Sequence, residues 1–396
     1  MAQPSLRPEL SLMDGRFYAE DPHPRFRWMR ENEPVYWDEE AKLWGITRHA
    51  DLLTCSKDSE TYCNRFGMRP DSPPIPSMIN FDGDYHKRRR NLVNRGFTPR
   101  RVAAHETKIR SLCAGLIENA KQRGAVDFVR DVAAPLPMIV IGDMLGVRPE
   151  DRDDLLRWSD DLIAGLSLSA PPEALAAAGL AAQEYATYCA AVVAERRANS
   201  PGDDLMSILV HAEIDGERLD DEALLQESLL ILVGGDETTR HVITGGMYAL
   251  LQHPEQWQAL REGRVPIPQA VEEMLRWVTP IQNMARTVTR DVELQGRSLH
   301  EGDKLLLLYP SGNRDEAVFE EPDRFDITRD PNPHLAFGGY GAHFCLGSSL
   351  ARLELRVMFE ELTARVDTMT FDDDAAPPYR NSNFITGLEQ MPVRMA

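Results

Sequence analysis

The chain has 396 residues, 42% of them hydrophobic, and a formal net charge of −19. It can bury a sizeable core, whereas its acidity disfavours nucleic acid as a partner because phosphate binding requires a basic face. Its five irregularly spaced cysteines contain no CxxC pair, which disfavours a disulfide framework and a structural zinc site. No signal segment is evident, and no apolar run approaches the ~20 residues of a membrane span. We therefore expect a cytoplasmic protein without a membrane span.

In chain order, the predicted elements give a mainly α protein with a minor β part. Residues 1–60 combine a helical stretch with two short strands, PVYWDE and LWGITR. The segment 291–310 predicts a strand, a turn and a second strand, with glycines as punctuation. A final helix is expected directly after Cys345. The other candidate helices span 100–123, 150–168, 173–198, 220–252 and 266–278.

A basic stretch, HKRRRNLVNRGFTPRR, occupies residues 86–101 and holds seven Lys or Arg with no acid. One interpretation is a solvated helix face. The alternatives are a docking surface for an acidic partner and a set of charge partners for a buried anionic ligand. The residues alone leave all three open. The proline-rich loop 66–78, just before this stretch, is placed to cover a site.

The longest predicted helix, 221–252, contains the sequence GGDETT at its centre. Two adjacent glycines inside a helix cost about 1 kcal/mol each relative to alanine, so they require a reason. Gly234 and Thr238 are four residues apart and share one helix face, where the missing side chain would let a flat ligand lie against the backbone. Glu237 places an ionisable group beside the hydroxyl. The alternative is a helix kink with a surface acid.

A pair of opposite charges, Glu273 and Arg276, is spaced i, i+3 on the helix predicted at 266–278, so both side chains share one face. Taken alone, such a pair is typical of a helix surface and contributes little stability. Arg324 lies further on, in the segment EEPDRF near a predicted turn.

The stretch FGGYGAHFCLG, residues 337–347, sets Cys345 among four glycines just before a predicted helix. Free N–H groups and the helix dipole favour a thiolate at such a place. A thiolate held in this way is either a nucleophile or a metal ligand. A nucleophile needs a base, and His343 is the nearest candidate, but residues two apart in a glycine loop seldom face each other. A soft metal ligand remains, and a single thiolate opposite an apolar helix suits haem iron.

The motifs FGGYGAHFCLG, GGDETT, EMLR and PDRF stand in the order and rough spacing of the cytochrome P-450 superfamily, which the chain resembles over essentially its whole length. The resemblance implies one domain over 1–396, with its β-rich part at about 30–80 and 280–335. It also implies haem b between the long central helix and the helix after the cysteine loop, with Cys345 as the axial ligand of the iron. One departure is that the family most often has Phe seven residues before the cysteine. Here that residue is Gly338, and Phe337 is eight before.

The resemblance carries roles to individual positions. Glu237 and Thr238 look like the catalytic acid–alcohol pair over the distal face of the haem. Glu273, Arg276 and Arg324 look like a structural triad behind it. The positions that resemble haem-binding residues are His86, Arg90, Gly234, Arg286, Phe337, His343 and Gly347.

Electrons must come from outside the chain, because it contains no flavin or iron–sulfur motif. The resemblance therefore implies a ferredoxin and its reductase as partners, with O2 as co-substrate and a monomeric enzyme. An acidic ferredoxin is expected to dock on Arg88, Arg89, Arg100, Arg101 and Arg352.

The substrate is expected to be large and apolar, because the positions that resemble pocket residues are mostly apolar. Several stretches, among them NFITGLEQMP, resemble actinobacterial enzymes that hydroxylate the terminal methyl of the cholesterol or cholestenone side chain. Terpenoid, macrolide and fatty acyl substrates are alternatives. A haem-thiolate sensor or a peroxide-driven enzyme is disfavoured, since neither needs the Glu237–Thr238 pair. The expected substrate-lining residues are Met78, Ile79, Val233, Ile281, Met284 and Ile385.

Overall fold

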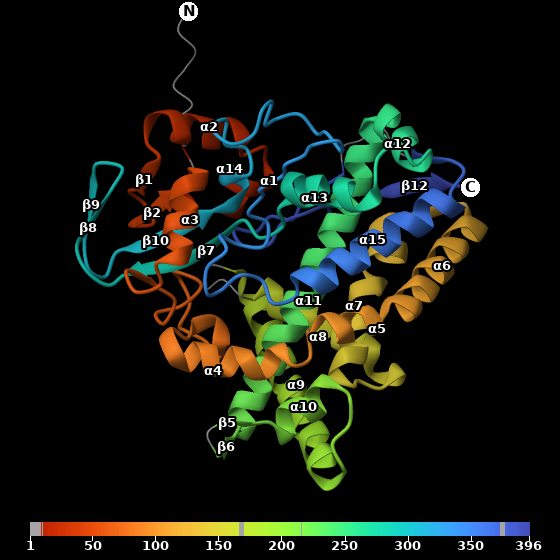
Figure 1. The fold of residues 1–396 in the computed structure, drawn as a ribbon, viewed down its shortest axis with the longest axis horizontal. Coiled ribbons are helices and arrows are strands. Elements are labelled where there is room, and N and C mark those ends of the chain that lie inside the picture. Colours follow the sequence, from red (N-terminus) through yellow and green to blue (C-terminus); the bar gives the residue numbers. More distant parts are fainter. Residues whose placement is uncertain (1–8, 10, 166–169, 215, 373–376) are drawn as a thin grey trace, which may run out of the picture.

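The structure is a computed structural model that describes residues 9, 11–165, 170–214, 216–372 and 377–396. It is mainly helical with a minor β part, as predicted (Figure 1). Its α-helices are α1 Gly15–Ala19, α2 His23–Asn32, α3 His49–Lys57, α4 Gly83–Asn94, α5 Pro99–Ala104, α6 Glu106–Arg123, α7 Pro135–Leu145, α8 Arg152–Ala164, α9 Pro172–Ala198, α10 Leu205–His211, α11 Asp221–Gln252, α12 Pro254–Arg261, α13 Ile267–Val278, α14 Tyr309–Gly312 and α15 Ser348–Arg365. Shorter turns of helix are η1 Met78–Asn80, η2 Val129–Ala133 and η3 Pro149–Asp151.

The main sheet has five strands in the order β1-β2-β10-β7-β3. β2 and β10 run parallel, and the other neighbours run antiparallel. A three-stranded sheet has the order β11-β12-β4, and β5–β6 and β8–β9 are separate hairpins. The strands are β1 Val35–Asp38, β2 Leu43–Ile46, β3 Tyr62–Cys63, β4 Ala125–Asp127, β5 Glu213–Ile214, β6 Glu217–Arg218, β7 Asn283–Val288, β8 Val292–Leu294, β9 Arg297–Leu299, β10 Lys304–Leu308, β11 Met369–Phe371 and β12 Pro392–Met395.

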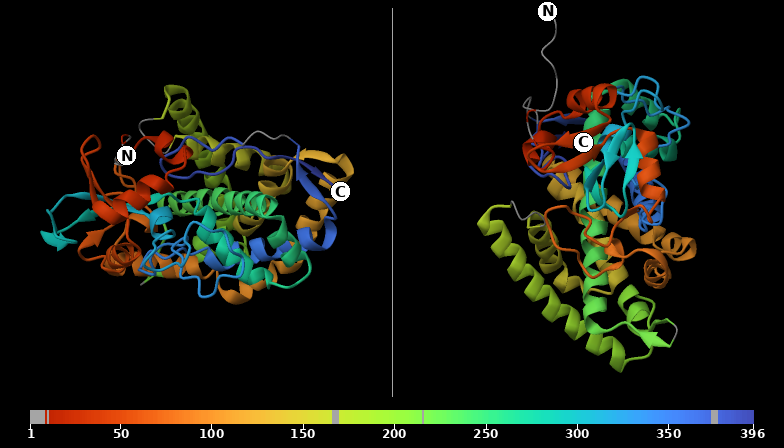
Figure 2. Two further views of the ribbon diagram at one scale, coloured as in Figure 1. Left: turned by 90° about the horizontal axis from the view of Figure 1, so that it is seen from above. Right: turned by 90° about the vertical axis from the view of Figure 1, so that its left-hand side faces the viewer.

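The helix α11 passes through the middle of the molecule, with the main sheet and α1–α3 on one side and α6, α7 and α15 on the other (Figure 1). Asp220 caps its start, because the side chain accepts a hydrogen bond from the N–H of Ala223 at 2.8 Å. Gly245 and Gly246 let α13 pack closely, since a Cβ at either would lie within 3 Å of a side chain of that helix. In Figure 2, α9 forms a long outer helix at the end away from the sheet.

Most predicted elements are confirmed, with two differences. The helix expected at 100–123 is two helices, α5 and α6, which meet at His105. The segment 291–310 forms three strands instead of two, because Gln295 and Gly296 both take positive φ and close the tight β8–β9 hairpin before β10 begins. The predicted end of the helix 150–168 lies outside the described residues.

The candidate helices predicted from the sequence do not include α7, whose sequence PLPMIVIGDML contains two prolines. Both prolines lie in the first turn of the helix, where a missing N–H removes no helical hydrogen bond. Among the described helices, none is both long and apolar enough to cross a membrane.

Candidate active site

The two glycines at the centre of α11 face different surroundings. A Cβ at Gly234 would meet no atom within 4 Å, whereas a Cβ at Gly235 would lie 2.8 Å from Ile141 of α7. One turn after Gly234, the hydroxyl of Thr238 donates a hydrogen bond to the Gly234 carbonyl at 3.1 Å. Gly234 and Thr238 therefore border open space on one face of the helix, and Gly235 packs against the core.

The cysteine loop is shaped by its glycines. Gly338 takes a φ of +88°, a conformation that favours glycine. A Cβ at Gly339 would lie 2.4 Å from the hydroxyl oxygen of Ser56, and one at Gly341 would overlap the Ser56 carbonyl. The doubled glycine thus combines a left-handed turn with close packing on α3, which spans Ser56. The loop closes when the N–H of Cys345 donates to the carbonyl of Phe337 at 3.0 Å.

Cys345 differs from the other four cysteines, all of which are buried, because it retains accessible surface. The protein around its sulfur still raises the pKa of the thiol by burial, while the N–H groups of Gly347 and Ser348 act in the opposite direction. A Cβ at Gly347 would meet nothing within 4 Å, so this side of the loop also borders open space. Burial therefore favours the neutral thiol, and a metal that binds the deprotonated sulfur would supply the positive charge that stabilises the thiolate.

Nitrogen-rich side chains from three separate segments gather near the cysteine loop. The rings of His86 and His343 lie 4.2 Å apart, centroid to centroid, and neither nitrogen of His86 has a hydrogen-bond partner among the described residues. Burial, together with the charges of His343 and Arg90, lowers the pKa of His86 to about 4. The guanidinium of Arg90 donates to the carbonyl of Phe344, and Arg286 is buried on β7. These groups fit an anionic ligand, because both nitrogens of His86 lack a hydrogen-bond partner among the described residues and two arginines lie with it, whereas Asp82 is 3.8 Å from Nε2 of His343.

Taken together, these residues fit haem. The thiol of Cys345 matches the soft thiolate ligand of haem iron. Gly234 and Gly347 leave room for a flat group, and the four donors from His86, Arg90, Arg286 and His343 match its acidic side chains. Phe337 lies under the guanidinium of Arg352, whose central carbon is 4.5 Å from the ring centroid.

Comparison with known families agrees with this geometry. A family model described as Cytochrome P450 matches residues 57–264 and 267–387, which is most of the chain. The chain is a cytochrome P450. As a member of this family it is a haem-dependent monooxygenase.

Relatives of this P450 match it over nearly their whole lengths. A steroid C26-monooxygenase of Mycobacterium tuberculosis (strain ATCC 25618 / H37Rv) is 49% identical over 388 residues, which cover 98% of this chain and 97% of the relative. A methyl-branched lipid omega-hydroxylase of Mycobacterium bovis is 38% identical, covering 97% of this chain and 94% of the relative. Among solved structures, a Mycobacterium marinum cytochrome P450 in complex with pseudoionone superposes with a TM-score of 0.90 at 33% identity, covering 99% of both chains.

The predicted structural triad of the P450 is partly wrong. Glu273 and Arg276 are both fully buried and form two hydrogen bonds of 2.7 Å. The side chain of Arg324, however, is exposed and pairs with Glu321; only its backbone carbonyl reaches Arg276, at 3.0 Å. The second cation near Glu273 is Arg329, with its Nε atom 3.3 Å away. Arg324 was favoured by its place in the motif, which does not fix where its side chain points.

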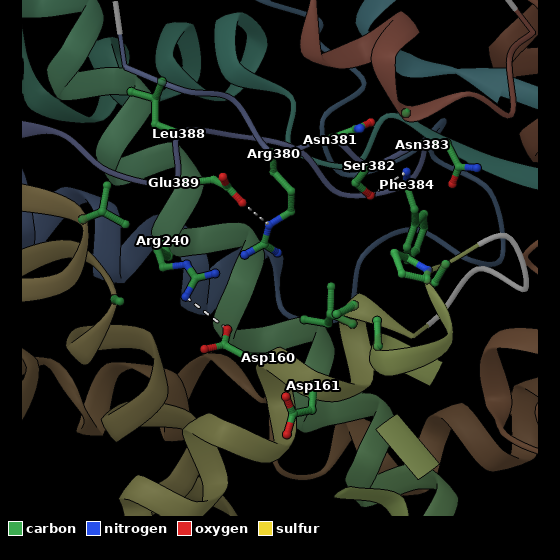
Figure 3. A pocket seen from close by; sticks show the side chains of 18 of the residues that line it. Asp160, Asp161, Arg240, Arg380, Asn381, Ser382, Asn383, Phe384, Leu388 and Glu389 are labelled. Atoms are coloured by element: carbon green, nitrogen blue, oxygen red, sulfur yellow. Dashed lines mark hydrogen bonds and ion pairs between the residues drawn. The ribbon is translucent and has the colours of Figure 1, made fainter. Parts of the chain in front are cut away.

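Glu237 of the predicted acid–alcohol pair is fully buried in an ion-pair network, and two of its partners, Arg240 and Arg380, are labelled in Figure 3. It accepts hydrogen bonds from Arg240, from His241 at 3.1 Å and from Arg380 at 2.8 Å. Burial opposes its ionisation, but the His241 hydrogen bond and the charges of Arg240 and Arg380 outweigh burial and hold its pKa well below the ordinary value. Glu237 therefore stays ionised. Its i+3 and i+4 partners were visible in the sequence, whereas Arg380, 143 residues away, gave no signal.

The network extends to a cleft on the molecular surface. Oxygen atoms of Asp160, Asp236 and Glu237 lie within 4.8 Å of one another, but the neighbouring Arg240 and Arg380 already supply the balancing positive charge. Asp160, Arg240 and Arg380 line a cleft of about 1790 Å³. The lining of this cleft includes none of the residues predicted to bind haem, but it includes Ile163 and Phe384.

Five of the six predicted substrate-lining residues belong to one apolar cluster. Its buried members are Met68, Ile163, Phe384 and Ile385, and the partly buried residues packed on them include Ile79, Val233, Ile281 and Met284. Met78 packs in the main core instead. Ile163 of α8 was missed, because an isoleucine on an amphipathic helix gives no sign of which cavity it faces.

Proposed function

We propose that this P450 hydroxylates the terminal methyl of a sterol side chain, that of cholesterol or cholest-4-en-3-one, with O2 and haem b. The observation that carries the proposal is the identity of 49% and 47% to two mycobacterial steroid C26-monooxygenases, each over at least 97% of both chains. A solved cytochrome P450 of Bacillus megaterium in complex with testosterone supports a steroid as the class of substrate. It is 33% identical to this chain with a TM-score of 0.87, and the match covers 95% of this chain and 98% of the Bacillus megaterium protein.

The apolar cluster supports a substrate of this kind. A sterol side chain has no polar atoms, so it must be held by burial, at about 25 cal/mol for each Å² removed from water. Ile79, Val233, Ile281, Met284 and Ile385 offer branched or flexible apolar side chains from four segments of the chain. Such a lining suits the end of an alkyl chain better than a group that needs hydrogen bonds.

The residues of the site have separate tasks in this proposal. Cys345 would ligate the iron, and His86, Arg90, Arg286 and His343 would hold the acidic side chains of the haem. When bound, haem supplies the redox chemistry that activates O2.

Proton supply falls to α11. The hydroxyl of Thr238 borders the open face beside Gly234, and the adjacent Glu237 is ionised and bonded to three cationic or titratable groups. In this proposal the Thr238 hydroxyl hands on the protons, and Glu237, which stays ionised, would attract them as a negatively charged acceptor from the side of the ion-pair network.

A ferredoxin and its reductase are proposed as the electron donors. Two of the predicted docking residues do not suit this role: Arg89 is buried, and both Nε and Nη2 of Arg352 are bonded to Glu272. Arg100 and Arg101 on α5 still suit it. α5 packs against α15, which begins three residues after Cys345, and a groove of about 330 Å³ runs between these helices and α13. A partner bound there would lie on the cysteine side of the haem.

The proposal is tested by spectral titration of the haem-loaded enzyme with cholest-4-en-3-one, an unbranched fatty acid and a terpene. We expect the sterol to give a saturable low-to-high-spin shift at low micromolar concentration, with weaker or absent shifts for the other two. A shift with the fatty acid or terpene but none with the sterol would overturn the sterol assignment.

A second candidate substrate is a methyl-branched lipid, favoured by the 38% identity to the omega-hydroxylase of Mycobacterium bovis. Hydroxylation at a chain-terminal methyl is common to both candidates. Adding a methyl-branched fatty acid to the same titration separates them, because the ligand that binds at the lower concentration identifies the substrate class.

A further inference from the structure

Glu227 is a fully buried carboxylate on α11 that the chemistry above does not use. Its Oε1 atom accepts a hydrogen bond of 2.9 Å from the backbone N–H of Met78, across 149 residues of sequence. Its Oε2 atom has no hydrogen-bond partner among the described residues. Burying a charge is costly unless it is paired and hydrogen-bonded, so this carboxylate is only partly compensated.

The nearest positive charge is that of Arg89 on α4. Its Nε atom lies 3.8 Å from Oε1 of Glu227, too far for a hydrogen bond. The Nη2 atom of Arg89 donates instead to the hydroxyl of Tyr85 at 2.9 Å, and the guanidinium lies over the ring of Phe81. Arg89 thus partly balances the charge of Glu227 without donating a hydrogen bond to it.

The backbone that Glu227 holds belongs to η1, whose next residue is Ile79. The Ile79 side chain packs on the apolar cluster proposed to receive the substrate. Its carbonyl accepts a hydrogen bond of 3.0 Å from the side chain of Asn64. Glu227 ties the same segment to α11, two turns before Val233 and Gly234. The position of Ile79 relative to α11 therefore depends on this bond.

We infer that Glu227 is a positioning residue, which sets Ile79 at the substrate by fixing the backbone of Met78 to α11, and that the closed position of η1 becomes less favourable when Glu227 loses its proton. In the neutral acid, a proton on Oε2 leaves Oε1 free to accept the Met78 N–H. In the ionised form the negative charge of Glu227 is buried, and the nearest cation, Arg89, is 3.8 Å away. Opening of η1 would expose this charge to water, so ionisation favours the open form.

The direction of the pH effect follows from linkage. Burial raises the pKa of Glu227 to about 7, while the Met78 N–H and the charge of Arg89 act against the rise. In an opened, solvated segment the pKa would return towards 4.5. The closed form binds the proton more tightly, so closure is favoured at low pH and this advantage is lost as pH rises through about 7. Between pH 6 and pH 8 the opening constant should rise about tenfold.

Amide hydrogen exchange at Met78, measured on the haem-loaded enzyme without substrate, tests the inference. After correction for the intrinsic exchange rate, we expect the wild-type opening constant to rise about tenfold from pH 6 to pH 8. Glu227→Gln keeps an oxygen acceptor but cannot ionise, so its opening constant should be the same at both pH values. Glu222→Gln, at an exposed acid in the first turn of α11, should retain the wild-type rise.

An opening constant that is independent of pH in the wild type, or one that rises in Glu227→Gln as it does in the wild type, would overturn the inference. If the Glu227→Gln variant does not fold, Arg89→Met provides a second variant for the same hydrogen-exchange experiment. Because Arg89 lowers the pKa of Glu227, its removal should move the rise to higher pH, and an unmoved profile would count against the inference.

The role of η1 at the substrate rests on the proposed function, so the dissociation constant of cholest-4-en-3-one is measured in parallel. It should increase with pH in the wild type and stay constant in Glu227→Gln. If no sterol binds but the exchange at Met78 depends on pH as expected, the sterol assignment fails and the positioning role of Glu227 is supported.

Discussion

Arg276 shows how a single side chain can join separate segments of the chain. It is fully buried, and besides Glu273 its guanidinium donates to the carbonyls of Asn313, Pro322 and Arg324, all within 3.0 Å. Glu273 in turn accepts hydrogen bonds from the N–H of Asp326 and from the side chain of Asn332. The pair thus fixes the segment from 313 to 332, which leads into the cysteine loop.

We expect Glu273→Ala to lower the free energy of unfolding by about 3–5 kcal/mol, because it leaves a buried arginine without its counter-charge. Urea unfolding of the haem-loaded protein measures the change. Arg324→Ala is the matched control, since its ion pair with Glu321 is exposed and should contribute little to stability. Similar losses in the two variants would contradict the assignment of Arg276 and Arg329, rather than Arg324, as the cations around Glu273.

At the residue scale, the spacing of two residues on one helix predicts whether their side chains meet, whereas the spacing of residues in a loop does not. The Glu273–Arg276 pair follows from an i, i+3 relation that any helix preserves. Arg324 and Arg329 lie in an irregular segment, so nothing local indicated which of the two would turn inward. For the same reason Arg380, which bonds Glu237 from a distant loop, had no sequence signal.

Among the elements, α11 was the most predictable and α7 the least. The acids at the start of α11 and the proline after its end marked both of its limits. α7 is absent from the predicted helices, although its two prolines lie in the first turn, where proline favours a helix. The sequence marks the glycine pair as unusual, but only the structure shows that Gly234 borders open space and Gly235 packs against Ile141.

The glycine pair of α11 gives a test at the element scale. Gly235→Ala should destabilise the protein by about 1–3 kcal/mol, because the new methyl group would clash with Ile141 of α7. Gly234→Ala should leave stability unchanged or raise it by up to about 1 kcal/mol, since its methyl group points into open space and alanine favours the helix. The two variants are compared by urea unfolding. The reverse order of stabilities would show that the open face has been assigned to the wrong glycine.

Over the whole molecule, a net charge of −19 sets the conditions for association with another acidic protein. Long-range repulsion must be overcome by a local basic area, and Arg100 and Arg101 on α5 stand beside the groove that α15 helps to line. The side chain of Arg101 remains about one-third exposed, although it also bonds Asp203.

Reversing both charges, in Arg100→Glu with Arg101→Glu, should slow ferredoxin-driven reduction about tenfold or more at low salt. Stopped-flow kinetics measure the rate, and the difference from wild type should shrink as salt screens the charges. Arg297→Glu, on the exposed strand β9 of the opposite part of the molecule, is the control and should react at the wild-type rate (Figure 1). An unchanged rate in the double variant would place the docking surface elsewhere.

The central claim is oxidation of the sterol terminal methyl, and one product analysis tests it most directly. The haem-loaded enzyme, supplied with a ferredoxin and its reductase, is incubated with cholest-4-en-3-one under isotopically labelled O2, and the product is identified by mass spectrometry and NMR. The account predicts a single labelled oxygen atom in a hydroxyl group on the terminal methyl of the side chain. Hydroxylation of the ring system, or a product whose oxygen comes from water, would contradict it.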